Sequence, residues 1–164
     1  MLSHRNLPLL LLQAREAVLA HFRPILNHFG LTEQQWRVIR ALAEAGPMEP
    51  NRIAETCQIL GPSLAGVLAR MEELGLVARR RLEADQRRVR VSLTAKSRAL
   101  FAHVAPLVEA QYRELESAVG KQAIAQAYRT LDRLIAQFGA PVAAVALPKS
   151  PPRAGARRRR ATRR

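Results

Sequence analysis

The sequence predicts a mainly α-helical protein with one small β-hairpin, an α+β chain, and three observations predict it. Apolar residues recur every three to four positions in six separate segments, which is the period of a helix with one buried face. Between residues 76 and 93 the period changes to the alternation of β-strands. The chain has 164 residues, 48% of them hydrophobic, enough for one packed domain with a tail.

The first predicted helix spans residues 7–29. Pro24 falls inside its apolar pattern, which resumes behind it, so we expect a kink there and not an end. Gly30 ends the helix. Thr32 and Gln35 have the spacing of a capping box and open the second helix.

Two short helices follow. Gly46-Pro47 ends the second helix, and a third is predicted over residues 50–57. A fourth opens at Pro62-Ser63 and ends at Gly75. Two helices of about two to four turns, joined by a few residues that include a glycine, are typical of a helix-turn-helix.

A β-hairpin is predicted directly after this motif. Residues 76–80 and 89–93 have strand patterns, and residues 82–87 between them are polar and predict a turn. A hairpin in this position is the wing of a winged helix-turn-helix.

Two further helices end the predicted fold. The first begins after Thr94, a suitable N-cap, and carries Pro106, where we expect a kink. Gly120 separates it from the second, which has an apolar face up to Phe138.

The chain is therefore predicted to have three parts. Residues 31–94 form the winged helix-turn-helix lobe, residues 1–30 and 95–139 supply dimerisation helices, and residues 140–164 form a disordered basic tail. A monomer of this size leaves the apolar faces of the terminal helices partly uncovered, so we expect a homodimer.

The positive charge is concentrated in two segments. The formal net charge is +14, of which residues 149–164 carry +8 and residues 79–98 carry +6. The rest of the chain is neutral. Such an excess indicates a polyanionic partner, nucleic acid first and an anionic membrane surface second. The 4% aromatic content argues against a surface that stacks single-stranded bases.

The sequence lacks the residue patterns of several classes of protein. Cys57 is the only cysteine, and His4, His21, His28 and His103 have no metal-ligand spacing, so we expect no metal and no other cofactor. Residues 7–12 are too short to span a bilayer, and no signal-cleavage pattern follows, so we expect no membrane partner and a cytoplasmic, nucleoid-associated protein. No nucleophile–base pair or phosphate loop indicates an enzyme.

The element order, with the residues at its joints, resembles the MarR family of bacterial transcriptional regulators. The pieces that carry the resemblance are residues 34–40 (QQWRVIR), 71–77 (MEELGLV) and 85–94 (DQRRVRVSLT). Within the family, the branch that regulates homoprotocatechuate (4-hydroxyphenylacetate) degradation is the most similar. The pieces that carry this second resemblance are residues 12–17, 22–25, 31–37 and 57–64. The arginine-rich tail and Arg88 depart from the family pattern.

The resemblance and the helix-turn-helix together predict the DNA contacts. The fourth helix is expected to enter the major groove. Its predicted contacts are Pro62, Ser63, Leu64, Gly66, Val67 and Arg70. The alternative is that Leu64 and Val67 belong to the core and that Gly66 is a packing site. With two modules in a dimer, the expected operator is a pseudo-palindrome of double-stranded DNA whose major grooves lie about 34 Å apart.

The wing is expected to contact the minor groove. Arg87 matches the family's wing-tip arginine, Asp85 is expected to orient it, and Arg88 to contact a phosphate. The alternative is a charged hairpin that is only solvated.

The resemblance also implies a small aromatic carboxylate as effector, of the hydroxyphenylacetate or hydroxynicotinate type. Arg15 is expected to hold the carboxylate with two hydrogen bonds, His21 a ring hydroxyl, and Trp36 to form an apolar wall. The alternatives are that Arg15 pairs with a local glutamate and that Trp36 is core. Repression is a family expectation.

Three other interpretations stay open. An enzyme of aromatic catabolism and a non-specific architectural DNA protein built on the tail are the competing functions. Cys57, at the helix-turn-helix, is a conceivable redox switch, although a lone buried cysteine is usually inert.

Overall fold

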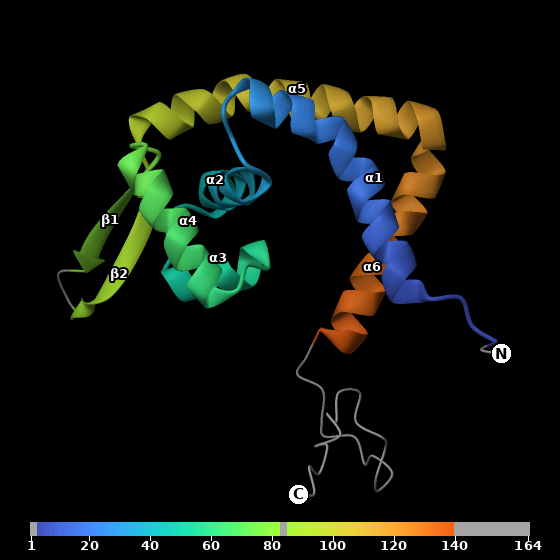
Figure 1. The fold of residues 1–164 in the computed structure, drawn as a ribbon, viewed down its shortest axis with the longest axis horizontal. Helices are drawn as coiled ribbons and strands as arrows, with labels where there is room; N and C mark the ends of the chain where they lie inside the picture. Colours follow the sequence, from blue (N-terminus) through green and yellow to red (C-terminus); the bar gives the residue numbers. More distant parts are fainter. Residues whose placement is uncertain (1–2, 83–84, 140–164) are drawn as a thin grey trace, which may run out of the picture. The chain divides into compact units, whose positions relative to one another are not determined.

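The computed structural model describes residues 3–82 and 85–139, with residues 82, 85 and 86 described by their backbone alone. The chain divides into two compact units, Met1–Val119 and Gly120–Arg164, each described here by itself. Its elements are α1 (Leu7–His28), α2 (Glu33–Ala45), α3 (Pro50–Cys57), α4 (Gly61–Glu73), β1 (Val77–Leu82), β2 (Asp85–Leu93), α5 (Ala95–Val119) and α6 (Lys121–Phe138) (Figure 1). This order confirms the predicted fold class. The predicted tail, 140–164, lies outside the described residues.

The helix boundaries follow local sequence signals. Thr32 and Gln35 form the predicted capping box, in which each side chain accepts a hydrogen bond from the other residue's backbone N–H. Thr94 and Ser97 cap α5 in the same reciprocal way. Pro24 lies inside α1, which continues past it as expected. These elements therefore begin where the sequence predicts, because capping depends on residues only three positions apart.

The hairpin is longer than predicted. Val77 pairs with Leu93 and Arg79 with Val91, and the ladder reaches Leu82 opposite Asp85 after an irregularity. Arg87 therefore lies in β2 and not in a turn over residues 82–87, which corrects the sequence prediction, and β2 includes Arg88 as well. The alternating apolar pattern stops at Val89, but backbone hydrogen bonds continue the ladder without apolar side chains.

A further strand contact was not predicted. Met48, in the connection between α2 and α3, donates its backbone N–H to the Val91 carbonyl at 3.0 Å and accepts from the Val91 N–H at 2.8 Å. A single bridging residue has no period, so the sequence carried no signal for it. The bridge fixes β2 against the start of the helix-turn-helix.

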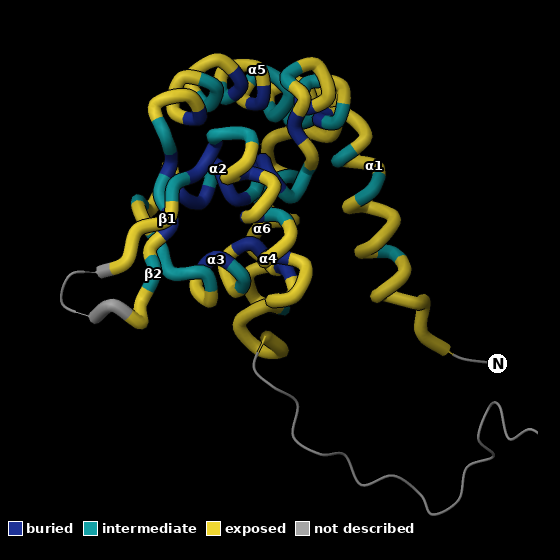
Figure 2. Tube along the Cα trace, turned by 60° about the vertical axis from the view of Figure 1, so that its left-hand side comes forward, coloured by how far each residue is buried: buried dark blue, intermediate teal, exposed yellow. Residues whose placement is uncertain are grey.

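The core of the first unit joins the helix-turn-helix to the wing and to α5. Figure 2 shows its buried residues concentrated in α2, α4 and the inner parts of β1 and β2. The fully buried large side chains are Ile39, Ile53, Leu68, Met71, Val38, Val91 and Val104. A close-packed core of this kind makes the lobe a rigid carrier for the surface of α4.

The two ends of the helical part bury little. In α1 only Phe22 and Leu26 are buried, while Leu7, Leu9, Leu11 and Leu12 in its first two turns are exposed. In α6, which belongs to the second unit, no residue is buried, and Tyr128, Ile135 and Phe138 are exposed. Each unit thus carries a run of exposed apolar side chains on one of its helices.

Candidate DNA interface and effector site

The second helix of the helix-turn-helix presents a mostly small and uncharged surface. Helix α3 ends at Cys57, Gln58 takes the left-handed conformation at φ 49°, and α4 begins at Gly61. On α4, Pro62, Ser63 and Gly66 are exposed. These side chains are therefore available to a partner.

Leu64 is not available in this way. It is 2% exposed and packs in the core of the lobe, and Val67 is half-buried against the same core. The prediction that Leu64 contacts DNA is therefore corrected, because its side chain lies in the core of the lobe and not on the surface of α4. The alternative that Leu64 belongs to the core is the one that its burial supports.

No close neighbour among the described residues requires a glycine at position 66. A Cβ built on Gly66 meets no atom within 4 Å, so the alternative of a packing site does not apply. Glycine in a helix interior is less stable than alanine by about 0.5–1 kcal/mol. Gly66 leaves the backbone of α4 open at this turn.

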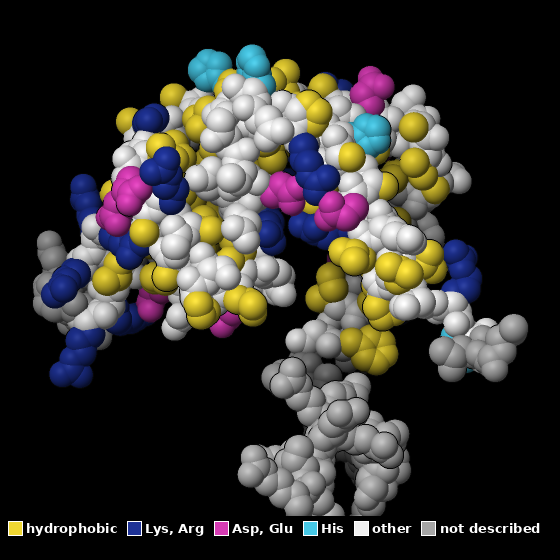
Figure 3. Space-filling model, viewed as in Figure 1, with side chains coloured by type: hydrophobic (Ala, Val, Ile, Leu, Met, Phe, Trp, Pro, Cys, Tyr) yellow, Lys and Arg dark blue, Asp and Glu magenta, His cyan; other side chains and the backbone are white. Residues whose placement is uncertain are grey.

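The successive arginines of β1 point to opposite faces of the hairpin. Arg79 turns to α4, where its Nε lies 3.1 Å from a carboxylate oxygen of Glu72. Arg80 lies on the other face, directly opposite Arg90 of β2. Like charges opposite each other are unfavourable. An anion on this face of the wing would reduce the repulsion between Arg80 and Arg90. Figure 3 shows basic side chains gathered over the hairpin.

The wing is also tied to the helix-turn-helix. Arg88 forms an ion pair with Glu49, the N-cap residue of α3, whose carboxylate does not cap its own helix. Arg87 is exposed on β2, and Arg70 of α4 pairs with Glu73 at 3.0 Å. The side chain of Asp85 lies outside the described residues. DNA phosphates would have to replace the glutamates beside Arg70 and Arg88.

Arg15 belongs to a closed ring of ion pairs between α1 and α2. It donates to Glu16 at 2.5 Å and to Glu33 at 3.2 Å. Arg23 donates to the other oxygens of the same two carboxylates, at 2.5 and 2.6 Å. The hydrogen bond from Arg23 lowers the pKa of Glu16 below its usual value, although burial opposes this. The charge of Arg15 is thus already balanced, and the alternative that Arg15 pairs with a local glutamate is the one that these contacts support.

His21 does not join this group. It is exposed, and at 3.6 residues per turn it lies about 120° around α1 from Arg15. The structure therefore does not bring Arg15, His21 and Trp36 together around one site.

Trp36 has a different set of neighbours. It is 9% exposed, and its ring stacks on Phe101 of α5 at a centroid distance of 5.6 Å. One turn further along α2, the pKa of Arg40 is raised by hydrogen bonds to Glu44 and to Tyr112 of α5, against the effect of burial. Tyr112 also contacts Phe22 of α1, with ring centroids 4.9 Å apart. Arg40 and Tyr112 were missed from the sequence because they lie on different helices, α2 and α5, and come together only in the folded chain.

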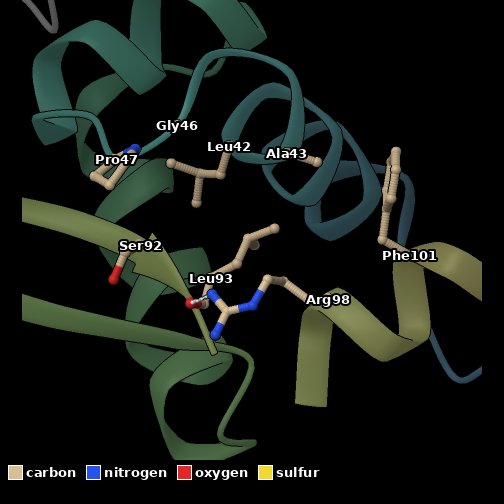
Figure 4. Close-up of a pocket in the computed structure, with 8 residues that line it drawn as sticks. All are labelled: Leu42, Ala43, Gly46, Pro47, Ser92, Leu93, Arg98 and Phe101. Atoms are coloured by element: carbon tan, nitrogen blue, oxygen red, sulfur yellow. Dashed lines mark hydrogen bonds between the residues drawn. The ribbon is translucent and has the colours of Figure 1, made fainter. Parts of the chain in front are cut away.

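A pocket adjoins this aromatic cluster through Phe101 (Figure 4). Its volume is about 450 Å³, and its one charged group, Arg98, donates from Nη1 to the Leu93 carbonyl at 2.7 Å. It is lined by Leu42, Ala43, Gly46, Pro47, Ser92, Leu93, Arg98 and Phe101. The lining comes from α2, the connection that follows it, β2 and α5, so the pocket lies between Phe101 and the base of the wing.

Two kinds of feature are absent from the described residues. No group of three or more His, Cys, Asp or Glu side chains is placed to hold a metal ion. Within residues 3–82 and 85–139, no helix is long and apolar enough to cross a membrane.

Comparison with known proteins agrees with this geometry. The MarR family model matches residues 29–88, from the end of α1 to the wing. The chain is also 42% identical to the homoprotocatechuate degradative operon repressor of Escherichia coli, over 81% of this chain and 90% of that protein. The chain belongs to the MarR family. It is therefore a transcriptional regulator with a winged helix-turn-helix, as the sequence predicts.

Solved structures of MarR-family relatives show the same fold. A crystal structure of NadR in complex with 4-hydroxyphenylacetate is 40% identical, with a TM-score of 0.72 and coverage of 82% of this chain and 95% of that one. The transcriptional regulator PA4135 is 46% identical, with a TM-score of 0.76 and coverage of 80% and 96%. The E. coli repressor and NadR confirm the predicted similarity to the homoprotocatechuate (4-hydroxyphenylacetate) branch of the family.

Proposed function

We propose that this MarR-family protein represses an operon for the degradation of an aromatic acid and leaves its operator when a hydroxylated aromatic carboxylate binds. The single observation that carries this proposal is that α2 serves both sites. Trp36 and Arg40 on α2 meet the aromatic side chains of α5, while Arg37 between them donates to the Cys57 carbonyl at 2.6 Å. Cys57 ends α3, so one helix connects the aromatic cluster to the helix-turn-helix.

The effector is a carboxylate with a ring hydroxyl, of the 4-hydroxyphenylacetate or homoprotocatechuate type. The bound ligand named for NadR and the operon named for the E. coli relative support this class. A hydroxynicotinate offers the same two groups and is the alternative effector. In this proposal Trp36 remains an apolar wall of the site, and His21 has no part because it lies on another face of α1.

Arg40, and not Arg15, holds the effector carboxylate. Arg15 already donates to Glu16 and Glu33, whereas Arg40 lies one turn from Trp36 beside the Tyr112 hydroxyl. A guanidinium has five N–H donors in a planar fork, so Arg40 can donate hydrogen bonds to an effector carboxylate while it keeps its bond to Glu44.

DNA is bound by a homodimer. Exposed leucines of the first turns of α1 and the exposed apolar face of α6 are the surfaces that a second copy covers. The two α4 helices then enter successive major grooves of a pseudo-palindromic operator, about 34 Å apart. Pro62, Ser63, Gly66, Val67 and Arg70 of α4 are the proposed contacts there.

On the wing, Arg87 and Arg88 are the proposed contacts, with Asp85 as a brace. An effector that prefers a dimer with another spacing shifts the population away from the DNA-bound state.

The experiment compares operator and random DNA. The full-length protein selects duplexes from a random library, and the selected duplex and a scrambled one are titrated at near-physiological salt, with and without 4-hydroxyphenylacetate or 6-hydroxynicotinate. We expect a palindromic consensus, binding at least about a thousandfold tighter than to scrambled DNA, and release by one of the two acids. Equal binding of both duplexes would instead indicate an architectural DNA protein, and turnover of the acid an enzyme.

A protein of this function works in the cytoplasm on the nucleoid, where its DNA partner lies. No catalytic residue, metal or cofactor enters the proposed mechanism.

A further inference from the structure

Leu60 is an exposed leucine at the start of the helix that faces DNA. It is 79% exposed, the highest fraction among the large apolar side chains of the described residues. It is not a loosely held residue, because its carbonyl accepts the first hydrogen bond of α4, from the Leu64 N–H at 2.8 Å. Leu60 is thus held in place with its side chain in solvent.

The exposed face of α4 continues this apolar surface. Pro62, Ala65, Gly66 and Ala69 follow one another at helical spacing, and all are exposed. None of them carries a side-chain hydrogen-bond donor or acceptor. The open space above Gly66 lets a partner approach the helix backbone closely.

Few hydrogen-bonding side chains remain to identify a base. On the exposed side of α4, Ser63 has a short hydroxyl, and Arg70 is paired with Glu73. In the major groove the one apolar mark of a base is the C5-methyl group of thymine. A leucine beside a small-residue face can exclude water from such methyl groups but cannot distinguish hydrogen-bonding edges.

We propose that Leu60, with the small apolar face of Pro62, Ala65, Gly66 and Ala69, recognises thymine methyl groups in the major groove. This inference rests on the proposed DNA-binding function and adds its chemistry of recognition. The partner is DNA and not an apolar protein surface, because the arginines of the wing, Arg80, Arg87 and Arg90, belong to the same lobe and favour a polyanion.

The test is a double-mutant cycle between protein and DNA. The duplex selected by the full-length protein is synthesised with uracil in place of each thymine in turn, which removes one methyl group and no hydrogen-bonding atom. Wild type, Leu60→Ala and Arg87→Ala are titrated against each duplex at fixed salt. Removal of one buried methyl group weakens binding about fourfold.

We expect at least one uracil position in each half-site to weaken wild-type binding about fourfold. Leu60→Ala should abolish this penalty, whereas Arg87→Ala should lower affinity and keep it, because the wing does not contact the methyl group. Equal binding of uracil and thymine duplexes by wild type overturns the inference, and so does an unchanged penalty in Leu60→Ala. If the library yields no preferred duplex, the proposed function fails instead, and the two failures are thereby distinguished.

Discussion

The indole ring of Trp36 stacks on the phenyl ring of Phe101, with the ring centroids 5.6 Å apart and the ring planes inclined by 19°. Trp36 stands on α2 beside Arg40, and Phe101 lines the pocket whose other walls include Ser92 and Leu93 of the wing. This pair of rings therefore connects the proposed effector site to the base of the hairpin.

Replacing Trp36 should reveal how much the stack stabilises the lobe. Trp36→Ala is expected to lower the free energy of unfolding by about 3–5 kcal/mol, because a large buried aromatic ring leaves a cavity. Trp36→Phe keeps a ring against Phe101 and should lose clearly less. Urea unfolding followed by far-UV circular dichroism measures both variants. Equal losses for the two would show that the ring contact contributes little.

The two arginines considered for the effector carboxylate should behave differently. Arg40→Ala is expected to weaken effector binding about 10- to 100-fold, the range for losing hydrogen bonds to a charged group. Arg15→Ala should leave effector binding close to wild type, because Arg15 is balanced by Glu16 and Glu33. Trp36 is the only tryptophan, so its fluorescence during titration with 4-hydroxyphenylacetate reports binding in both variants. If Arg15→Ala weakened effector binding and Arg40→Ala did not, Arg15 would be the residue that holds the carboxylate.

Gly66→Ala should change stability and DNA binding in opposite directions. The free energy of unfolding should rise by about 0.5–1 kcal/mol, because the new Cβ meets open space in a helix interior. Affinity for the selected operator should fall about fivefold or more, because overpacking a close contact costs about 1–3 kcal/mol. Urea unfolding without DNA and operator titration measure the two effects separately. An unchanged operator affinity would mean that DNA does not approach this turn.

The ion-pair ring should make a pH-dependent contribution. Hydrogen bonding to Arg23 lowers the pKa of Glu16 in the folded protein below its ordinary value of 4.5. The contribution of the Glu16 carboxylate to the free energy of unfolding is therefore fully present above that value. It is lost as the pH falls through the pKa of the folded protein. Glu16→Gln should lower the melting temperature at neutral pH and have no such effect at strongly acid pH. A difference in melting temperature that is equal at both pH values would contradict this.

Deletion of residues 149–164 should reduce the salt dependence of DNA binding. The tail has eight basic and no acidic residues. If each neutralises one phosphate, the slope of log affinity against log salt falls in magnitude by up to about 7. The preference for operator over scrambled duplex should stay as it is, because phosphate contacts carry no sequence information. Titrations at several salt concentrations measure the slope, and a lost preference would give the tail another role.

Much of the fold could be predicted because its signals are local. The capping box of Thr32 and Gln35 lies within one turn of helix, and the change of apolar period at the hairpin lies within a few residues. Met48 shows the limit, since its bridge to Val91 is a backbone contact between residues far apart in the sequence and leaves no pattern.

The candidate sites were predictable only in part, for a similar reason. Leu64 is on the helical apolar period of Leu68 and Met71, which favoured the core, whereas no local signal showed that Gly66 stands in open space. Arg15 and Arg40 are both arginines on amphipathic helices, and only the folded chain shows that Glu16 and Glu33 surround the first.

The sequence by itself determined the order of the elements, the family and the concentration of positive charge in the wing and the tail, because each is a property of residue identity or short-range spacing. The tertiary structure alone decided that Arg88 pairs with Glu49, that Trp36 meets Phe101 and that Leu60 stands in solvent. The physical reason is that burial and ion pairing depend on distances between side chains, and these are set only when helices far apart in the chain pack together.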